Sequence, residues 1–163
     1  MASRNSIWFY TLAISALVLD QITKFAARAM LTLGHKVTVI PGFFDLELSY
    51  NSGGAFGMLP NWTPLFIIVA LVAIYAIVRL RRAGPDSRSL AIGLGLLLGG
   101  ALGNLVDRLI SPHREVTDFL SFHIGTRSWP TFNVADIAIV VGALFTLFYV
   151  YVIEKRRVRG SEL

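Results

Sequence analysis

Long runs of apolar residues, separated by short polar segments, dominate the sequence. Residues 62–78, 90–106 and 137–153 contain no Asp, Glu, Lys or Arg. Each run is about 17 residues long and covers roughly 25 Å as an α-helix, which spans a bilayer once interfacial flanks are added. These runs therefore predict three membrane-spanning helices.

A fourth apolar run covers residues 5–19, but Asp20, Lys24 and Arg28 follow it closely. A cleavable signal peptide is the alternative interpretation, with Ala27-Arg28-Ala29 as a nominal cleavage site. That site lies about ten residues beyond the apolar core and behind two charges, which is untypical of a signal peptide. We therefore predict four spans, at about 5–28, 60–79, 89–108 and 133–153.

Two of the connections between these runs have the pattern of strands. Residues 37–40 are all β-branched, Pro41-Gly42 is a turn signal, and apolar residues alternate with polar ones over 44–50. A matching alternation over 116–124 places Asp118 on an apolar face. We expect a small sheet on the membrane surface, with one apolar face on each segment. Its outer β segments are predicted at about 36–50 and 115–125.

The composition indicates lipid rather than water as the solvent of this chain. Charged residues make up 15% of the sequence, against about 25% in an average soluble domain, and the mean hydropathy is +0.64. The absence of Cys excludes a disulfide scaffold, a thiolate metal site and a Cys nucleophile. The predicted fold class is a membrane protein, mainly α, in which one domain (1–163) combines four transmembrane helices with a small extracytoplasmic β-sheet.

The net charge of +5 raises the question of a nucleic-acid partner. The basic residues, however, bracket the apolar runs instead of forming one patch, so we expect no such partner. By the positive-inside rule, the short basic segments face the cytoplasm, which places both termini there and both β segments outside. These segments hold nine of the 15 Lys and Arg residues: Arg4, Arg79, Arg81, Arg82, Arg88, Lys155, Arg156, Arg157 and Arg159.

Ionisable residues in or near a span are energetically costly, which makes each of them a functional candidate. Asp20 and Lys24 lie four residues apart on one helix face, and a salt bridge that anchors the first span is the structural alternative. Asn104, Asp107 and Arg108 share a face near the outer end of the third span. An ion pair between Asp107 and Arg108 explains two of these three residues, but not the amide.

Asn133 and Asp136 stand at the outer start of the fourth span, just after Pro130 and Thr131, which are helix-start signals. A first-turn acid stabilised by the helix dipole is the structural alternative for Asp136.

Glycines mark two further positions. Gly53 and Gly54, in the segment 51–56, allow close backbone approach or simply form the turn before the second span. Gly95, Gly99 and Gly103 recur every four residues and predict tight helix contacts.

Several kinds of catalytic site can be compared from these residues. The three His residues lack the spacing of a shared helical metal site, which argues against a zinc enzyme. Lys24 with Ser49 or Ser52 is one hydrolytic possibility, a Ser-Lys pair. Asp118 and Asp136, both at the outer membrane edge, are the other. Two carboxylates at close range share a proton and polarise a water, because they cannot both ionise.

Taken together, the motifs resemble those of the bacterial lipoprotein signal peptidases, the signal peptidase II family of intramembrane aspartic proteases. The resemblance extends over essentially the whole chain. It rests on five motifs in order: Asp20-Gln21-Ile22-Thr23-Lys24, Asn51-Ser52-Gly53-Gly54-Ala55-Phe56, residues 100–108, Val116-Thr117-Asp118-Phe119 and Phe132-Asn133-Val134-Ala135-Asp136. Gly54 replaces the usual Ala, Thr117 replaces a common Val, and residues 111–115 resemble an insertion.

The resemblance implies an endopeptidase of the bacterial cytoplasmic membrane that cleaves signal peptides from prolipoproteins before a diacylglyceryl-modified Cys. It also implies that the enzyme needs neither a metal nor an organic cofactor, that it contacts membrane lipid and that it is a monomer. Asp118 and Asp136 correspond to the catalytic pair. The polar shell that orients them or the substrate corresponds to Asn51, Asn104, Arg108 and Asn133. The resemblance further implies that four residues give structural support near the site: Asp20, Lys24, Gly53 and Gly54.

Two other classes of protein are compatible with the residues alone. A small transporter also places Asp and Arg within the membrane, but such proteins usually show paired repeats, and this sequence shows none. An assembly factor could use the face formed by Gly95, Gly99 and Gly103, but it has no need for two separated acids supported by amides.

Overall fold

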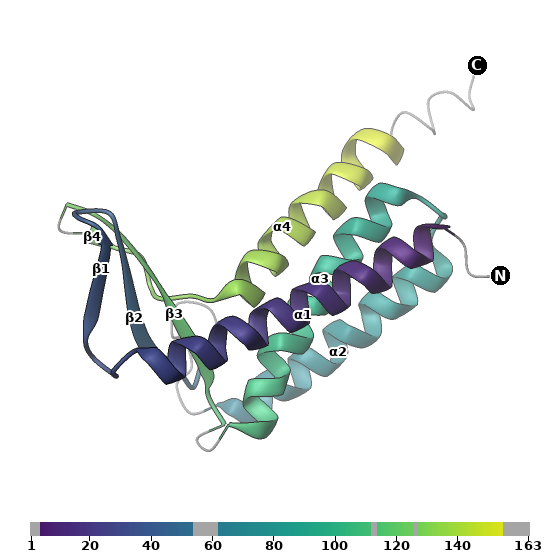
Figure 1. Cartoon of the computed structure of the whole chain (residues 1–163). Helices are drawn as coiled ribbons and strands as arrows, with labels where there is room; N and C mark the ends of the chain where they lie inside the picture. The colour runs from purple at the N-terminus through teal and green to yellow at the C-terminus, as the bar shows by residue number, and fades with distance from the viewer. Residues whose placement is uncertain (1–3, 54–61, 112–113, 126, 155–163) are drawn as a thin grey trace.

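A bundle of four long helices carries a small antiparallel sheet at one end (Figure 1). The computed structural model describes residues 4–53, 62–111, 114–125 and 127–154. The start of α1 and the end of α4 lie at the end of the bundle opposite to the sheet (Figure 1). The elements in chain order are α1 (Arg4–Met30), β1 (Lys36–Ile40), β2 (Phe44–Asn51), α2 (Thr63–Ala83), α3 (Arg88–Ile110), β3 (Val116–Ile124), β4 (Arg127–Ser128), α4 (Val134–Phe148) and a π-helical segment, η2 (Tyr149–Glu154).

All four helices, α4 together with the start of η2, are long and apolar enough to cross a bilayer, which confirms the predicted fold class. The predicted boundaries need small corrections. The second span begins at Thr63 rather than 60, because Trp62 takes a non-helical conformation and a Pro follows in the first helical turn. The fourth begins at Val134, after Asn133 as its N-terminal cap.

Helix α3 is the centre of the bundle and packs against α1, α2 and α4. More than half of its span is buried inside the protein (56%), against 22% or less for the other three helices. A Cβ atom on Gly99 would lie 2.5 Å from the carbonyl oxygen of Ala13, so only a glycine permits this approach of α1. The predicted tight helix contact is thus confirmed, and α1 of the same chain occupies this face.

The sheet has the order β1-β2-β3-β4, with every pair antiparallel. The hairpin and the later strand occupy the predicted segments, whereas the two-residue strand β4 was not predicted. Strand β1 is exposed throughout, whereas Val116 to Phe119 of β3 are all buried, so both faces of β3 are covered there, which the alternation did not predict. Strand β3 contacts both α1 and α3, so these two helices cover its second face.

Candidate active site

Asp118 and Asp136 come together around one asparagine, Asn133. Asp118 lies in β3 and is 2% exposed, whereas Asp136 lies in the first turn of α4. The side-chain Nδ2 of Asn133 donates to Oδ1 of Asp118 at 2.6 Å, and its backbone N–H donates to Oδ2 of Asp136 at 3.2 Å. A single residue therefore connects the two carboxyl groups, which are 18 positions apart in the sequence.

The start of α4 explains why Asn133 takes this orientation. Its Oδ1 accepts a hydrogen bond from the backbone N–H of Asp136 at 3.0 Å, which together with the reverse bond forms a capping box. A backbone N–H can only donate, so the amide oxygen faces α4 and the Nδ2 group faces Asp118. The predicted role of Asp136 as a first-turn acid is confirmed, and the same geometry places it beside Asp118.

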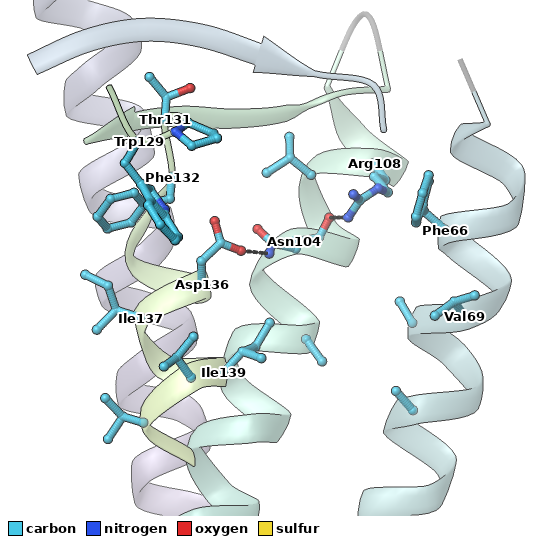
Figure 2. A pocket seen from close by; sticks show the side chains of 17 residues that line it. Phe66, Val69, Asn104, Arg108, Trp129, Thr131, Phe132, Asp136, Ile137 and Ile139 are labelled. Carbon is cyan, nitrogen blue, oxygen red and sulfur yellow. Dashed lines mark hydrogen bonds between the residues drawn. The ribbon is translucent and has the colours of Figure 1, made fainter. Parts of the chain in front are cut away.

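Asn104, on α3, supports Asp136 from the other side (Figure 2). Its Nδ2 donates to Oδ1 of Asp136 at 2.8 Å, while its Oδ1 accepts from Nζ of Lys24 at 3.0 Å and from Nδ2 of Asn133 at 3.2 Å. Because the lysine side chain only donates, it fixes the oxygen of Asn104 on its own side. Lys24 thereby directs the Asn104 amide donor toward Asp136.

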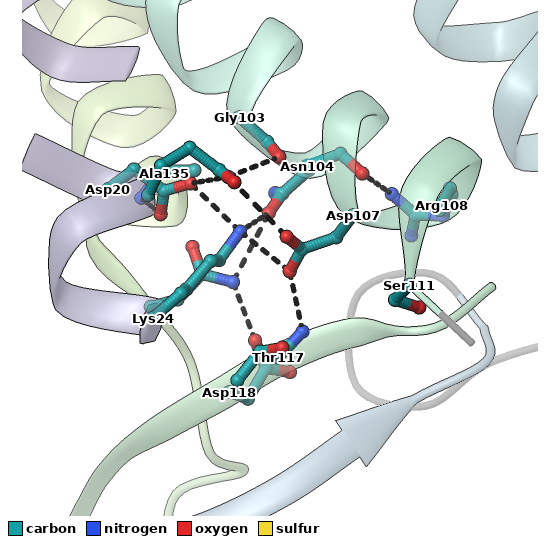
Figure 3. A network of polar contacts seen from close by, with 12 residues as sticks. Asp20, Lys24, Gly103, Asn104, Asp107, Arg108, Ser111, Thr117, Asp118 and Ala135 are labelled. Atoms are coloured by element: carbon teal, nitrogen blue, oxygen red, sulfur yellow. Dashed lines mark hydrogen bonds and ion pairs between the residues drawn. The ribbon is translucent and has the colours of Figure 1, made fainter. Parts of the chain in front are cut away.

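The predicted salt bridge between Asp20 and Lys24 is present and fully buried, with 2.9 Å between Oδ2 and Nζ (Figure 3). Lys24 also pairs with Oδ2 of Asp107 at 3.2 Å, and Oδ1 of Asp20 accepts from the backbone N–H of Ala135 at 2.8 Å. The network therefore joins α1, α3 and the start of α4 directly behind the site. The ion pairs in this network differ from those predicted from the sequence, because Asp107 pairs with Lys24 rather than with Arg108.

Arg108 instead connects α3 to the segment after β2. Its Nη2 donates to the carbonyl oxygen of Gly53 at 2.8 Å, and its guanidinium lies 5.4 Å from the ring centre of Phe66. The N–H of Gly53 in turn donates to Oδ1 of Asn51 at 2.9 Å, and Nδ2 of Asn51 faces Oδ2 of Asp118 at 3.3 Å. Gly53 thus supports the site through its backbone, whereas Gly54 lies outside the described residues.

Burial dominates the electrostatics of Asp118 and raises the pKa of its carboxyl group to about 7. The negative charge of Asp136 raises the pKa further, while hydrogen bonds from Asn133 and Asn51 and the charge of Lys24 oppose both effects. A carboxyl group with this pKa gains and loses a proton near neutral pH. Such a group can serve in acid–base catalysis.

A cavity of about 660 Å³ adjoins this site and lies between α2 and α4. Figure 2 shows Phe66 and Val69 of α2 across from Ile137 and Ile139 of α4, with Asp136 near the polar end. Most of its lining is apolar, and the titratable or amide groups among its lining residues are Asn104, Arg108 and Asp136. The cavity therefore suits an apolar peptide segment that places one peptide bond next to the carboxyl group of Asp136.

The geometry does not favour the Ser-Lys alternative. The three N–H donors of Lys24 have acceptors on Asp20, Asp107 and Asn104, and the Ser49 hydroxyl lies 2.6 Å from that of Thr131. Within the described parts of the chain, no group of three or more His, Asp or Glu side chains is arranged to hold a metal ion.

Sequence reasoning missed two residues of the buried network. Gln21 donates to the Asp20 carboxylate at 3.1 Å and to the carbonyl oxygen of Gly103 at 3.2 Å. Arg28 reaches Thr117 in β3. The position of Gln21 between two charges was the available signal. No local pattern indicates the partner of Arg28.

Comparison with known families identifies the chain. A family model described as signal peptidase (SPase) II matches residues 12–152. The chain belongs to the signal peptidase II family. The protein named lipoprotein signal peptidase of Maridesulfovibrio salexigens is 43% identical over 146 residues, covering 86% of this chain and 92% of that relative. The one of Symbiobacterium thermophilum is 40% identical over 147 residues, covering 89% and 95%.

Solved structures agree with this assignment. A bacterial membrane enzyme solved in meso at 2.3 Å has a TM-score of 0.80 and 28% identity, covering 87% of this chain and 86% of its own. A second, solved at 1.9 Å, has a TM-score of 0.77 and 28% identity, covering 90% and 92%. Membership of the signal peptidase II family confirms the resemblance predicted from the sequence and makes the chain a peptidase. The transporter and assembly-factor alternatives are not supported.

Proposed function

We propose that this signal peptidase II family member is an aspartic endopeptidase. It removes the signal peptide from lipid-modified prolipoproteins at the outer face of the bacterial cytoplasmic membrane. One observation carries this proposal: Asn133 joins the carboxyl groups of Asp118 and Asp136 beside an apolar cavity between two membrane-spanning helices. Relatives named lipoprotein signal peptidase support the choice of substrate.

The proposed reaction uses one proton shared by the two acids. The ionised carboxylate takes a proton from a water as that water attacks the scissile carbonyl carbon. The protonated carboxyl donates its proton to the carbonyl oxygen, which gives a tetrahedral diol. When the diol collapses, the C–N bond breaks and a proton passes to the leaving amine. The amides of Asn51, Asn104 and Asn133 hold both acids in place.

Arg108 supplies a donor for the substrate in this proposal. Its Nε atom is buried and has no hydrogen-bond partner among the described residues, although the side chain lines the cavity. A buried donor without an acceptor is costly, and a substrate carbonyl or ester oxygen can satisfy it. The Arg108 side chain is held by Gly53 and Asn104, so its orientation does not depend on the substrate.

Further features support the proposed substrate class and the proposed orientation of the protein in the membrane. The apolar walls of α2 and α4 suit a signal peptide, and the space between these helices lets the acyl chains of a diacylglyceryl-modified Cys remain in membrane lipid. Both catalytic acids come from one chain, which is consistent with a monomer. The basic residues after α2 and at the C-terminus favour an orientation with both termini in the cytoplasm and the sheet outside.

Cleavage of a defined precursor tests this proposal. The purified protein in detergent is incubated with a precursor peptide that carries a diacylglyceryl-modified Cys, and the products are identified by mass spectrometry. We expect one cut, on the amino side of the modified Cys, and little cleavage of the same peptide with an unmodified Cys. Absence of cleavage of the lipid-modified peptide, or a cut at another bond, would contradict the proposed function.

A further inference from the structure

Strand β3 is tied to the helix bundle at Thr117, directly before Asp118. Thr117 is completely buried. Its backbone N–H donates to Oδ2 of Asp107 on α3 at 2.9 Å, and its hydroxyl accepts from Nη1 of Arg28 on α1 at 2.8 Å. Figure 3 shows Thr117 and Asp107 facing each other across the space between β3 and α3. Two helices therefore hold the strand at this one residue.

Arg28 and Asp107 also interact with each other. Nη1 of Arg28 lies 3.8 Å from Oδ1 of Asp107, to which Gln21 also donates at 3.4 Å. Oδ2 of the same carboxylate faces both the Thr117 backbone N–H and Nζ of Lys24. Asp107 is 3% exposed, whereas the Arg28 side chain is 34% exposed and enters the site from the last turn of α1. We call these three residues, Arg28, Asp107 and Thr117, the strand anchor.

A second attachment lies on the other side of Asp118. The backbone N–H groups of Phe119 and Leu120 both donate to the carbonyl oxygen of Phe132, and the Phe132 N–H donates back to Leu120. Phe132 directly precedes Asn133, the residue that bonds both carboxyl groups. The strand anchor and the Phe132 contacts thus lie on either side of Asp118, and the anchor connects β3 to α1 and α3.

We propose that Arg28 and Thr117 are positioning residues, which hold β3 so that Asp118 stays in hydrogen-bonding contact with Asn133 and next to Asp136. This inference rests on the proposed function of the two acids. A displacement of about 1 Å in a catalytic group can cost on the order of 100-fold in rate, even when the altered residue does not touch the substrate. The anchor therefore acts on turnover through Asp118.

Loss of the anchor also changes the environment in which Asp118 titrates. The charged groups that act on Asp118 are Lys24 on α1, Arg108 on α3 and Asp136 on α4. An outward shift of β3 exposes Asp118 to water and moves it away from Asp136. Because burial and the Asp136 charge both raise the pKa of Asp118, that pKa then falls toward the ordinary value of 3.8.

Substitutions at Thr117 test the proposal. Thr117→Val keeps the side-chain shape but removes the acceptor of Arg28, whereas Thr117→Ser keeps the hydroxyl. With the lipid-modified precursor, we expect Thr117→Val to lower kcat about tenfold or more, with KM within about twofold. The alkaline limb of the activity profile should move to lower pH. Thr117→Ser should retain at least about a third of the wild-type kcat.

Arg28→Met tests the anchor from the other partner and leaves the strand sequence unchanged. We expect it to lower kcat as Thr117→Val does, and the double variant should be no slower than the slower single variant, because both changes remove one interaction. Thr146→Val is the matched control. It deletes a 2.8 Å hydroxyl bond to the carbonyl of Gly142 on α4, away from the site, and should leave kcat and the pH profile unchanged.

Three results would overturn the proposal. These are a wild-type kcat and pH profile for Thr117→Val or Arg28→Met, an equal loss of kcat in Thr146→Val, and additive losses in the double variant. If Thr117→Val does not fold, Arg28→Met decides alone. Failure of the proposed function can be distinguished from failure of this inference. If the Asp118→Asn variant is active, the two-acid site is contradicted. If Asp118→Asn is inactive while Thr117→Val is fully active, only the role of the strand anchor is contradicted.

Discussion

Asp118→Asn and Asp136→Asn should each abolish cleavage of a lipid-modified precursor while leaving a folded, membrane-inserted protein. The amide keeps the size and shape of the carboxyl group but can neither take a proton from water nor return one to the leaving group. Acid–base groups of this kind contribute on the order of 10²- to 10⁴-fold each, and the proposed reaction uses both acids in every turnover. Initial rates of product formation, measured by mass spectrometry, give the effect.

Stability measurements supply the control for Asp118→Asn. The raised pKa of Asp118 means that the folded protein binds this proton more tightly than the unfolded chain. The free energy of unfolding therefore falls as pH rises from about 4 to about 7, by up to about 1.4 kcal/mol per pH unit. Asn does not titrate. The variant should thus unfold at a higher temperature than wild type above pH 7, and this advantage should disappear near pH 4.

Serine variants separate this mechanism from the Ser-Lys alternative. Ser49→Ala and Ser52→Ala should each keep most of the activity, because neither hydroxyl is needed to activate water in the two-acid reaction. Lys24→Ala is a poor test, because it would leave the carboxylates of Asp20 and Asp107 buried without their cation. Substantial cleavage by either Asn variant, or inactive serine variants, would contradict the two-acid mechanism.

Substitutions of Asn133 should produce the second-largest loss, because this residue bonds both acids. Asn133→Ser keeps an oxygen that can cap α4, whereas Asn133→Ala loses the cap as well, at a cost of about 1 kcal/mol in stability. Both variants lack the Nδ2 donor that reaches Asp118 at 2.6 Å. Asp118 becomes charged as it gives up its proton in the proposed reaction, and loss of a hydrogen bond to a charged group corresponds to about 10- to 100-fold in rate. We expect this fall in kcat for both variants and a lower Tm for Ala alone.

Asn5→Ala is the matched control for these variants. Asn5 also donates from Nδ2, in a 3.0 Å bond to the carbonyl of Asp86, but it lies in the first turn of α1, and the start of α1 is at the end of the bundle opposite to the sheet (Figure 1). Its loss should leave kcat unchanged. If Asn133→Ser retained the wild-type kcat, the bridge between the two acids would have no catalytic importance, and the central observation of the proposal would be lost.

The four spans could be predicted from sequence because lipid tolerates few charges, so uncharged runs mark the helices directly. The strands were also predictable, from alternation and the Pro41-Gly42 turn. The burial of β3 was not, because its second face is covered by helices that come from distant parts of the chain. Alternation describes a strand with one buried face, and it fails where a bundle covers the other.

The candidate site could be predicted as a set of residues but not as a network. Helical spacing correctly paired Asp20 with Lys24, which lie one turn apart. The same reasoning offered Arg108 as the partner of Asp107, whereas the structure places Lys24 and Arg28 of another helix there. Contacts between helices depend on how the bundle packs, and local spacing carries no information about that. For the same reason, Arg28 was not identified as a contact of Thr117.

The pH dependence of kcat for the wild-type protein, with the lipid-modified precursor, tests the central claim most directly. If Asp118 and Asp136 share one proton in the reactive state, hydrolysis should follow a bell-shaped profile. Its alkaline limb should lie near pH 7, where Asp118 loses its proton and both carboxylates become ionised. A rate that stays constant or rises between about pH 6 and 9 would contradict a two-acid reaction in which Asp118 must hold a proton.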